Sequence, residues 1–327
     1  MYSMLMNACS IALFGFSNGI KVSDMNWSHL MVLDACRYDI FRRVYREFFP
    51  DGKVLCVKSK TASTMEFVRG LLSLDEQKLK EIIYVSANPM VDLTLGEKRA
   101  LFFKYVPTWR KAWNNHLNTV LPKSVYYDAL KTFLHYPTKR MIIHFLQPHF
   151  PFVDNKYFYL NEICESIMSR AKKEAEKGSR QGILANLKVA AGIVKAALSK
   201  GYICAGIPQE LCEFIRARPE EVRQAYTSNL RQVLFYVKKL AQILPGKIVV
   251  TADHGEAFGE KLSRILPIRV YGHPSRIRID ALTKVMYLEI DNRFKSRENA
   301  MQQALKEITK HNISKLKNKP MVVKSIN

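Results

Sequence analysis

The hydrophobic pattern of the chain is a series of short apolar runs, each of which stops abruptly at polar residues. Five such runs, HLMVLD, KVLCVKS, EIIYVSAN, RMIIHFLQPH and KIVVTADH, end at Asp34, at residues 59–64, at Asn88, at residues 147–149 and at residues 253–254. Runs that are apolar on both faces are typical of central parallel strands covered by helices. Since ligands of open α/β sheets bind beyond the carboxyl ends of such strands, we expect the five polar endings to share one functional edge.

Helical patterns separate these runs and complete an α/β prediction. Residues 65–74 follow the second run, and Pro219 with Glu220 and Glu221 is typical of the start of a helix that continues to residue 244. Residues 284–290 indicate a late strand, residues 155–215 a helical insertion without a strand signal, and residues 294–320 a basic C-terminal helix. We therefore predict a single domain over residues 1–327, built as a three-layer α/β sandwich around a central, mostly parallel sheet.

The charge balance points to an anionic partner. The 327 residues include 51 Lys and Arg against 29 Asp and Glu, a formal net charge of +22. Such a surface attracts anions, although a uniformly solvated basic surface is the alternative. The chain has no recognised nucleic-acid-binding module, so specific nucleic-acid binding is not expected. We expect the partner to be a phosphate or sulfate ester, with linkage to a glycan or lipid as one option.

The cysteines and the first apolar stretch bear on the cellular setting. The six cysteines are scattered without a CxxC pair, which is typical of reduced, buried thiols in an intracellular protein. The apolar stretch at residues 4–16 is shorter than the ~20 residues that span a bilayer, and it lacks the basic start of a signal peptide. We expect a cytoplasmic protein without a membrane span, with peripheral membrane association as an alternative.

Three polar features at the predicted edge carry candidate chemistry. Asp34 ends an otherwise uncharged strand, a hydroxyl cluster of Thr61, Ser63 and Thr64 precedes a helix, and Asp253 and His254 follow a buried run. Helix N-capping is the structural alternative for Asp34 and for the hydroxyls. A buried acid beside an imidazole is harder to explain structurally, because a buried charge is costly unless it is paired or binds a metal. Two carboxylates, an imidazole and a hydroxyl suit Zn²⁺ or Mn²⁺, with Mg²⁺ and Ca²⁺ as alternatives, and such an ion would activate the hydroxyl for attack on phosphorus or sulfur.

Two histidines and one arginine are candidates for contact with the substrate. His149 in QPHFP and His273 in YGHP lie beside prolines, which fix the backbone there. Either histidine could bind a tetrahedral anion, protonate a leaving group or bind a second metal, and a plain turn histidine is the alternative. Arg37 could reach the anion or lie on a helix surface. His144 lies inside an apolar run and is interpreted as a satisfied core histidine.

Taken in order, these motifs resemble those of a known superfamily. VLDACRYD, KTASTMEF, HFLQPHFPF, TADHGEAFGE and YGHP are similar to motifs of the alkaline phosphatase and sulfatase superfamily, and especially of archaeal sulfatase-like proteins of unsettled substrate. The resemblance implies metals at the carboxyl edge of the sheet. It implies metal roles for Asp34, Asp253 and His254, a nucleophile and ligand role for Thr64 with Ser63 and Thr61 as alternatives, and substrate-side roles for His149 and His273.

Departures from the sulfatase pattern favour phosphate chemistry. The stretch from Ala62 to Glu66 lacks a Cys-x-Pro-x-Arg or Ser-x-Pro-x-Arg signature, so formylglycine chemistry is not expected. A threonine nucleophile beside one metal is closer to the pattern of phosphoethanolamine- or glycerophosphate-transferring relatives. We predict a metal-dependent hydrolase or transferase acting on a phosphate ester. The alternatives are a sulfatase-like sulfuric ester hydrolase without formylglycine, and a catalytically inactive protein that binds an anionic glycan or lipid.

Overall fold

A seven-stranded, mostly parallel sheet forms the centre of the protein. The computed structural model describes residues 26–162, 172–173, 176, 201–264 and 267–317. The strand order is β2 (Val54–Lys58), β12 (Lys284–Asn292), β9 (Gly246–Ala252), β1 (His29–Asp34), β7 (Arg140–Pro148), β3 (Ile82–Ser86) and β4 (Lys104–Pro107). All pairings from β9 to β4 are parallel, whereas β12 is antiparallel to both of its neighbours. The predicted central sheet is therefore confirmed.

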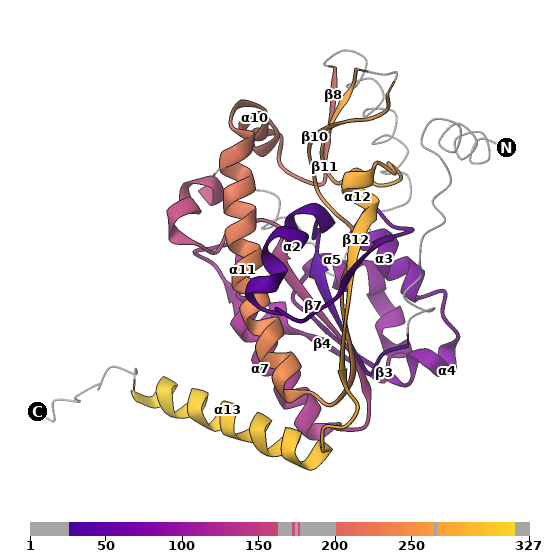
Figure 1. Ribbon diagram of the computed structural model, residues 1–327, viewed down its shortest axis with the longest axis vertical. Helices are drawn as coiled ribbons and strands as arrows, with labels where there is room; N and C mark the ends of the chain where they lie inside the picture. Colours follow the sequence, from indigo (N-terminus) through magenta and orange to yellow (C-terminus); the bar gives the residue numbers. More distant parts are fainter. Residues whose placement is uncertain (1–25, 163–171, 174–175, 177–200, 265–266, 318–327) are drawn as a thin grey trace, which may run out of the picture.

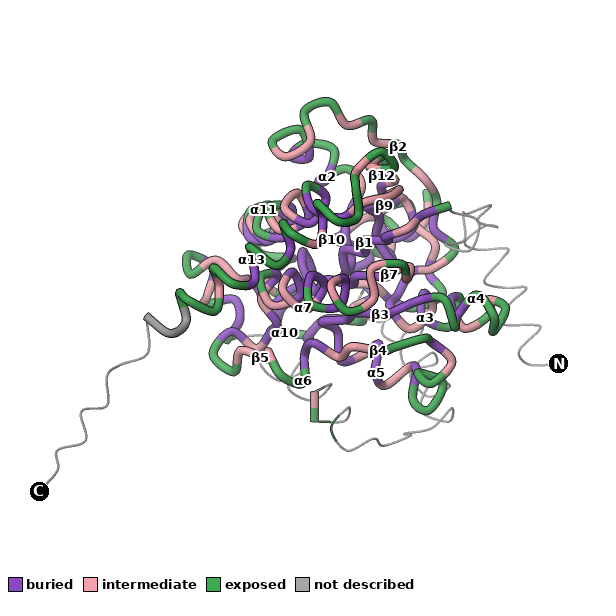
Figure 2. Tube along the Cα trace, turned by 90° about the horizontal axis from the view of Figure 1, so that it is seen from below, coloured by how far each residue is buried: buried purple, intermediate pink, exposed green. Residues whose placement is uncertain are grey.

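Helices cover both faces of this sheet and make three layers (Figure 1). Alternate residues of β1 face opposite sides, with Met31 and Leu33 in one apolar cluster and Leu30 and Val32 in another. One face is covered by α2 (Tyr38–Val44), α7 (Pro122–His135), α11 (Pro219–Ile243) and α13 (Arg297–Lys317), and the other by α3 (Thr64–Leu71), α4 (Glu76–Leu79) and α5 (Pro89–Leu95). Figure 2 shows the strands as the buried middle of the fold, which explains why their sequences are apolar on both faces.

Short elements complete the connections. They are the 3₁₀ helices η2 (Tyr45–Glu47), η3 (Gly96–Leu101) and η4 (Asn155–Tyr157), the helices α6 (Thr108–Ala112) and α12 (Asp280–Thr283), and the strand pair β5 (Trp113–Asn114) and β6 (Thr119–Val120). The predicted helices at residues 65–74, 218–244 and 294–320 correspond to α3, α11 and α13. None of the described helices combines the length and the apolarity that a membrane crossing requires. The apolar stretch at residues 4–16 lies outside the described residues.

A second, three-stranded sheet lies beyond the carboxyl edge of the first, at the top of Figure 1. Its order is β10 (Ala257–Lys261), β11 (Arg269–Gly272) and β8 (Tyr202–Ala205), and α10 (Gln209–Ala217) follows β8. The strand β8 falls within the 155–215 segment, where we predicted no strand. That prediction was wrong because β8 is fixed by pairing with the distant β11, which the local pattern does not reveal. Much of the predicted helical insertion lies outside the described residues.

Two local predictions also need correction. The run of β2 was expected to be a buried central strand, but β2 lies at the sheet edge and its Leu55 is 58% exposed. The cysteines were expected to be reduced, but Cys204 and Cys212 form a disulfide between β8 and α10. Their Cα atoms lie 6.3 Å apart because the chain turns back at Gly206. Cys36 is a buried thiol as expected, whereas Cys56 is exposed.

Candidate metal centre

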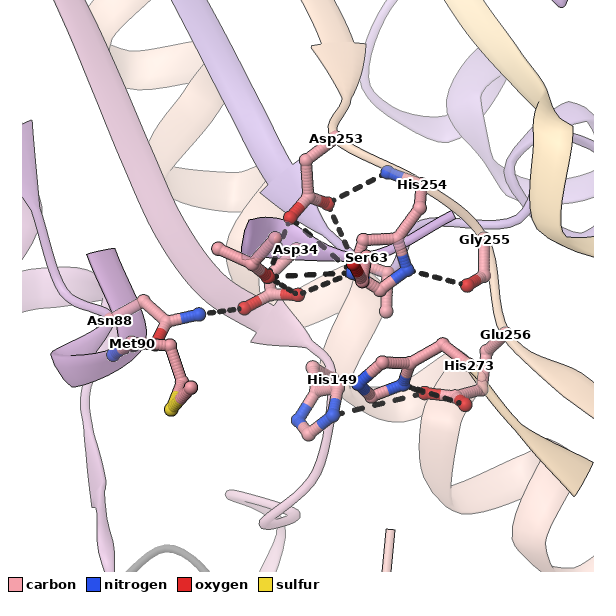
Figure 3. Close-up of polar contacts among 12 residues, drawn as sticks. Asp34, Ser63, Asn88, Met90, His149, Asp253, His254, Gly255, Glu256 and His273 are labelled. Atoms are coloured by element: carbon pink, nitrogen blue, oxygen red, sulfur yellow. Dashed lines mark hydrogen bonds and ion pairs between the residues drawn. The ribbon is translucent and has the colours of Figure 1, made fainter. Parts of the chain in front are cut away.

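Asp34 and Asp253 meet because their strands are neighbours. Asp34 is the last residue of β1, and Asp253 directly follows β9, which pairs with β1 in parallel. The Oδ1 atom of Asp253 accepts hydrogen bonds from the backbone N–H groups of Ala35, at 3.0 Å, and His254, at 2.9 Å. Asn88 donates to Oδ2 of Asp34 at 2.5 Å. These bonds hold both carboxylates with their remaining oxygens toward a common centre (Figure 3).

His254 adds an imidazole nitrogen to the two carboxylates. Its Nε2 atom lies 3.6 Å from Oδ1 of Asp34 and 3.4 Å from Oδ2 of Asp253. Its Nδ1 lies 2.7 Å from the carbonyl oxygen of Gly255. Because Nδ1–H donates to this carbonyl, the lone pair of Nε2 faces the carboxylates, as in a histidine that binds a metal. Burial lowers the pKa of His254, which favours the neutral, ligating form.

The three candidate hydroxyls have different surroundings. Ser63 is the N-cap of α3 and accepts from the N–H of Glu66, so the capping alternative is correct for this residue. Thr61 donates to the main-chain oxygen of Asp253 at 2.6 Å. Thr64 alone of the three places its hydroxyl among the acids and the imidazole. Its Oγ1 lies 2.8 Å from Oδ2 of Asp253, 3.5 Å from Oδ1 of Asp34 and 3.4 Å from Nε2 of His254.

The electrostatics of this cluster suit a divalent cation. Burial, and then the charge of Asp253, raises the pKa of Asp34 well above its usual range. Burial also acts to raise the pKa of Asp253, but the neighbouring His254 and His144 hold it below its usual range. Among the described residues, neither carboxylate forms an ion pair with a lysine or arginine. Two buried carboxylates without a cation are costly, and a bound metal ion would balance them. The donor set therefore fits a divalent metal ion.

A second cluster lies beside the first and consists of His149, Glu256 and His273 (Figure 3). Nδ1 of His273 lies 3.1 Å from Oε1 of Glu256, and Nε2 of His149 lies 3.8 Å from Oε2. The ring centroids of His254 and His273 are 4.7 Å apart, so the two clusters are contiguous. Burial lowers the pKa of His149 and of His273 to about 4 and raises that of Glu256 to about 7. A carboxyl group that titrates near neutral pH beside two imidazoles can move a proton or bind a second metal.

His144 is a site residue that sequence analysis missed. Its Nδ1 lies 2.9 Å from the hydroxyl of Tyr84, but its Nε2 has no hydrogen-bond partner and lies 3.6 Å from Oδ2 of Asp253. It is therefore not the satisfied core histidine that we expected. Together with Asp34 and Asp253 it forms a possible ligand set that contains His144 instead of His254. The available signal was a histidine within one apolar strand, together with an acid at the end of a neighbouring strand. Asn88 was noted only as a strand ending, and its bond to Asp34 was not foreseen.

Arg37 lies near the site but is already bound to other groups. Its guanidinium donates to both carboxylate oxygens of Asp39 at 2.9 Å and contacts Glu260 at 2.5 Å. The same group donates to the carbonyl oxygen of Glu256 at 2.9 Å. Since four oxygen atoms of three residues occupy its donors, Arg37 in this arrangement positions the loop that carries Glu256.

Comparisons with known proteins report only a likeness of fold. No family model and no curated protein matches the chain. The C-terminal periplasmic domain of EcEptC from Escherichia coli is 12% identical, with 86% of this chain and 78% of that chain covered and a TM-score of 0.45. The same domain in complex with zinc has a TM-score of 0.44. The soluble domain of lipooligosaccharide phosphoethanolamine transferase A from Neisseria meningitidis is 13% identical, with 84% and 81% covered and a TM-score of 0.45. The Neisseria protein is a phosphoethanolamine transferase. At these values the likeness assigns no residue role and no activity to this chain.

Proposed function

We propose that the protein is a metal-dependent hydrolase or transferase of phosphate esters with Thr64 as its nucleophile. Asp34, Asp253 and His254 would hold the divalent ion, with the Thr64 hydroxyl as a further ligand. The observation that carries this proposal is the position of Thr64 Oγ1, between 2.8 and 3.5 Å from one atom of each of the three ligating side chains. Thr64 is also the first residue of α3, and the N-terminal end of a helix stabilises a bound anion.

The chain's own groups can then be given steps in the reaction. A divalent ion at this site would lower the pKa of the Thr64 hydroxyl and offset the charge of the phosphate. The Thr64 hydroxyl releases its proton to solvent, and its Oγ1 forms a bond to phosphorus while the bond from phosphorus to the leaving oxygen breaks. The leaving oxygen takes a proton from the cluster of His149, Glu256 and His273. Glu256 suits this role because a general acid works best when its pKa is near the working pH.

The product of this first step is a phospho-threonine at Thr64. Transfer of its phosphoryl group to water would make the protein a hydrolase, and transfer to an acceptor hydroxyl would make it a transferase. Sulfate esters have the same tetrahedral geometry, so an unmodified threonine could also act on them. Arg37 in this proposal acts indirectly, through its bond to the carbonyl of Glu256.

The nucleophile is tested with chromogenic phosphodiester, phosphomonoester and aryl sulfate substrates in the presence of Mn²⁺ or Zn²⁺. We expect turnover of a phosphate ester by the parent, loss of at least about 10²-fold in Thr64→Ala, and partial activity in Thr64→Ser, which keeps the hydroxyl. Thr61→Ala and Ser63→Ala should retain most of the activity. Mass spectrometry of the quenched parent should find a phosphate on Thr64.

The possible outcomes separate the alternatives. Unchanged turnover in Thr64→Ala would refute this assignment, and a loss confined to Thr61→Ala or Ser63→Ala would move it to that hydroxyl. Preferential turnover of the aryl sulfate would favour the sulfuric ester alternative. Absence of turnover by the parent with either metal would favour the anion-binding alternative.

A further inference from the structure

A strongly basic pocket lies at the edge of the large sheet opposite the candidate metal centre. It has a volume of about 230 Å³ and lies where β1, β7 and β9 begin, at His29, Arg140 and Gly246. In Figure 1 this is the end of the sheet near α13, whereas the small sheet lies at the other end. Pockets for drug-sized ligands measure about 300–1,000 Å³, so this one suits a smaller molecule.

Five cationic side chains and no acidic one line this pocket. They are Lys139, Arg140, Arg293, Lys295 and Arg297. Two of them are paired with carboxylates outside the pocket: Lys139 with Glu81 at 2.9 Å and Arg293 with Asp291 at 2.7 Å.

The other three cations have no carboxylate partner among the described residues. Arg140 donates to the carbonyl of Trp27 at 3.0 Å and stacks on its ring, and Lys295 donates to main-chain carbonyls at the end of α11. Burial lowers the pKa of both Arg140 and Lys295, and no carboxylate balances their partly desolvated charges. Arg297 is exposed at the first residue of the 21-residue helix α13, whose N-terminal end adds positive potential.

The buried side chain of His29 supplies an independent sign of a ligand. His29 is 3% exposed, lines the pocket, and has an Nδ1 atom without a hydrogen-bond partner. The ring also interacts with the backbone of Pro245. In a neutral imidazole either nitrogen can carry the proton, so Nδ1 can accept a hydrogen bond or donate one. A buried polar atom without a partner destabilises the structure, so a ligand that satisfies it would bind more tightly.

We propose that the basic pocket binds inorganic phosphate. Hydrogen phosphate has three oxygens for the cations Arg140, Lys295 and Arg297, and one O–H group that can donate to Nδ1 of His29. Its size suits the small volume, and its two negative charges suit a lining that has five cationic side chains and no acidic one. Sulfate has the same shape and charge at neutral pH, so it should compete for the same pocket. This site is separate from the proposed esterase centre and does not depend on it.

The test is equilibrium dialysis of labelled phosphate against the full chain at pH 8, in EDTA and at an ionic strength fixed with chloride. EDTA removes any divalent ion, so the candidate metal centre cannot retain phosphate. We expect one phosphate per chain, with binding about tenfold weaker in Arg297→Gln, because a charge-assisted hydrogen bond is lost. The matched control is Lys306→Gln, which removes an exposed charge from the same helix and should leave binding unchanged. Sulfate, which has the same shape and charge, should compete with phosphate for this site.

Several results would overturn the proposal. They are no saturable binding by the parent, and equal weakening by Lys306→Gln. Asp253→Asn provides the test against the other site. It should bind phosphate as the parent does, even if it abolishes the proposed esterase activity, whereas loss of phosphate binding in this variant would place the anion at the metal centre.

Discussion

Replacing Asp253 by Asn should remove most of the stability that the protein gains from a divalent metal. The change removes one of the two buried carboxylates and keeps the shape of the side chain. The amide oxygen can still accept from the N–H groups of Ala35 and His254. The hydroxyl of Thr64 can turn from donor to acceptor, so few hydrogen bonds are lost.

The size of the effect follows from the geometry of the cluster. Ligand atoms of Asp34 and Asp253 lie within 4.8 Å of one another. Two unit charges at that distance repel by about 3.5 kcal/mol at an effective dielectric constant of about 20. A proton taken up by Asp34, whose pKa is raised, relieves part of this repulsion. Without metal, Asp253→Asn should therefore be as stable as the parent or more stable.

With metal the order should invert. A ligand at a hundredfold excess over its dissociation constant stabilises the folded state by about 2.7 kcal/mol. The parent should gain this amount from Mn²⁺ or Zn²⁺, whereas Asp253→Asn, with one ligand lost, should gain little. Urea denaturation of both proteins in EDTA and in excess metal gives the four free energies of unfolding.

Asp92→Asn is the matched control, since Asp92 is also buried but forms ion pairs with Arg99 and Arg110. It should lose stability equally with and without metal, because its arginines lose their partner in both conditions. An equal response to metal in the parent and in Asp253→Asn would refute the assignment of Asp253 as a ligand. Absence of any response in the parent would refute the metal centre itself.

Two further predictions concern stability. A Cβ atom on Gly255 would lie 2.0 Å from the carbonyl oxygen of Ala281, so Gly255→Ala must displace the loop that carries His254; we expect a loss of about 1–3 kcal/mol and a weaker response to metal. Gly70 lies at an exposed helical position with open space around it, so Gly70→Ala should instead stabilise the protein by up to about 1 kcal/mol. Equal changes in the unfolding free energy of the two variants, measured by urea denaturation, would contradict this reasoning. Burial lowers the pKa of His29 from 6.5 to about 4, so the unfolded chain binds a proton more readily between these values, and the stability contributed by neutral His29 is lost as the pH falls. The unfolding free energy of the parent minus that of His29→Gln should thus fall by about 3 kcal/mol from pH 7 to pH 4 in phosphate-free buffer, and a constant difference would show that His29 titrates normally.

The sequence predicted the central sheet and the edge that carries the acids because both depend on local pattern. An apolar run that ends in Asp34, and another that ends in Asp253, report burial and strand ends directly. The rule that ligands bind at the carboxyl ends of parallel strands then brings the two acids together without knowledge of the strand order. The choice among Thr61, Ser63 and Thr64 could not be made in this way. It depends on which hydroxyl the first turn of α3 directs inward, a difference of one residue that the pattern does not fix.

What the sequence did not reveal depends on long-range pairing. The strand β8 and the disulfide of Cys204 with Cys212 exist because β11 returns beside β8. The role of His144 depends on β7 lying directly beside β1, because only then does its Nε2 reach Asp253. A histidine in an apolar run is compatible both with the core and with a buried site, and only its neighbours distinguish the two.

The position of the positive charge is the clearest case of topology deciding function. A net charge of +22 predicts attraction to anions in general but names no site. The antiparallel direction of β12 carries the chain away from the acidic edge and delivers Arg293, Lys295 and Arg297 to the opposite one. There they meet Lys139 and Arg140, at the start of β7. A parallel strand at the same place in the sheet would have brought the three cations to the carboxylates, where they would compete with a metal ion. The reversed strand therefore separates a cation-binding edge from an anion-binding edge, and this is why the two proposed sites can be tested independently.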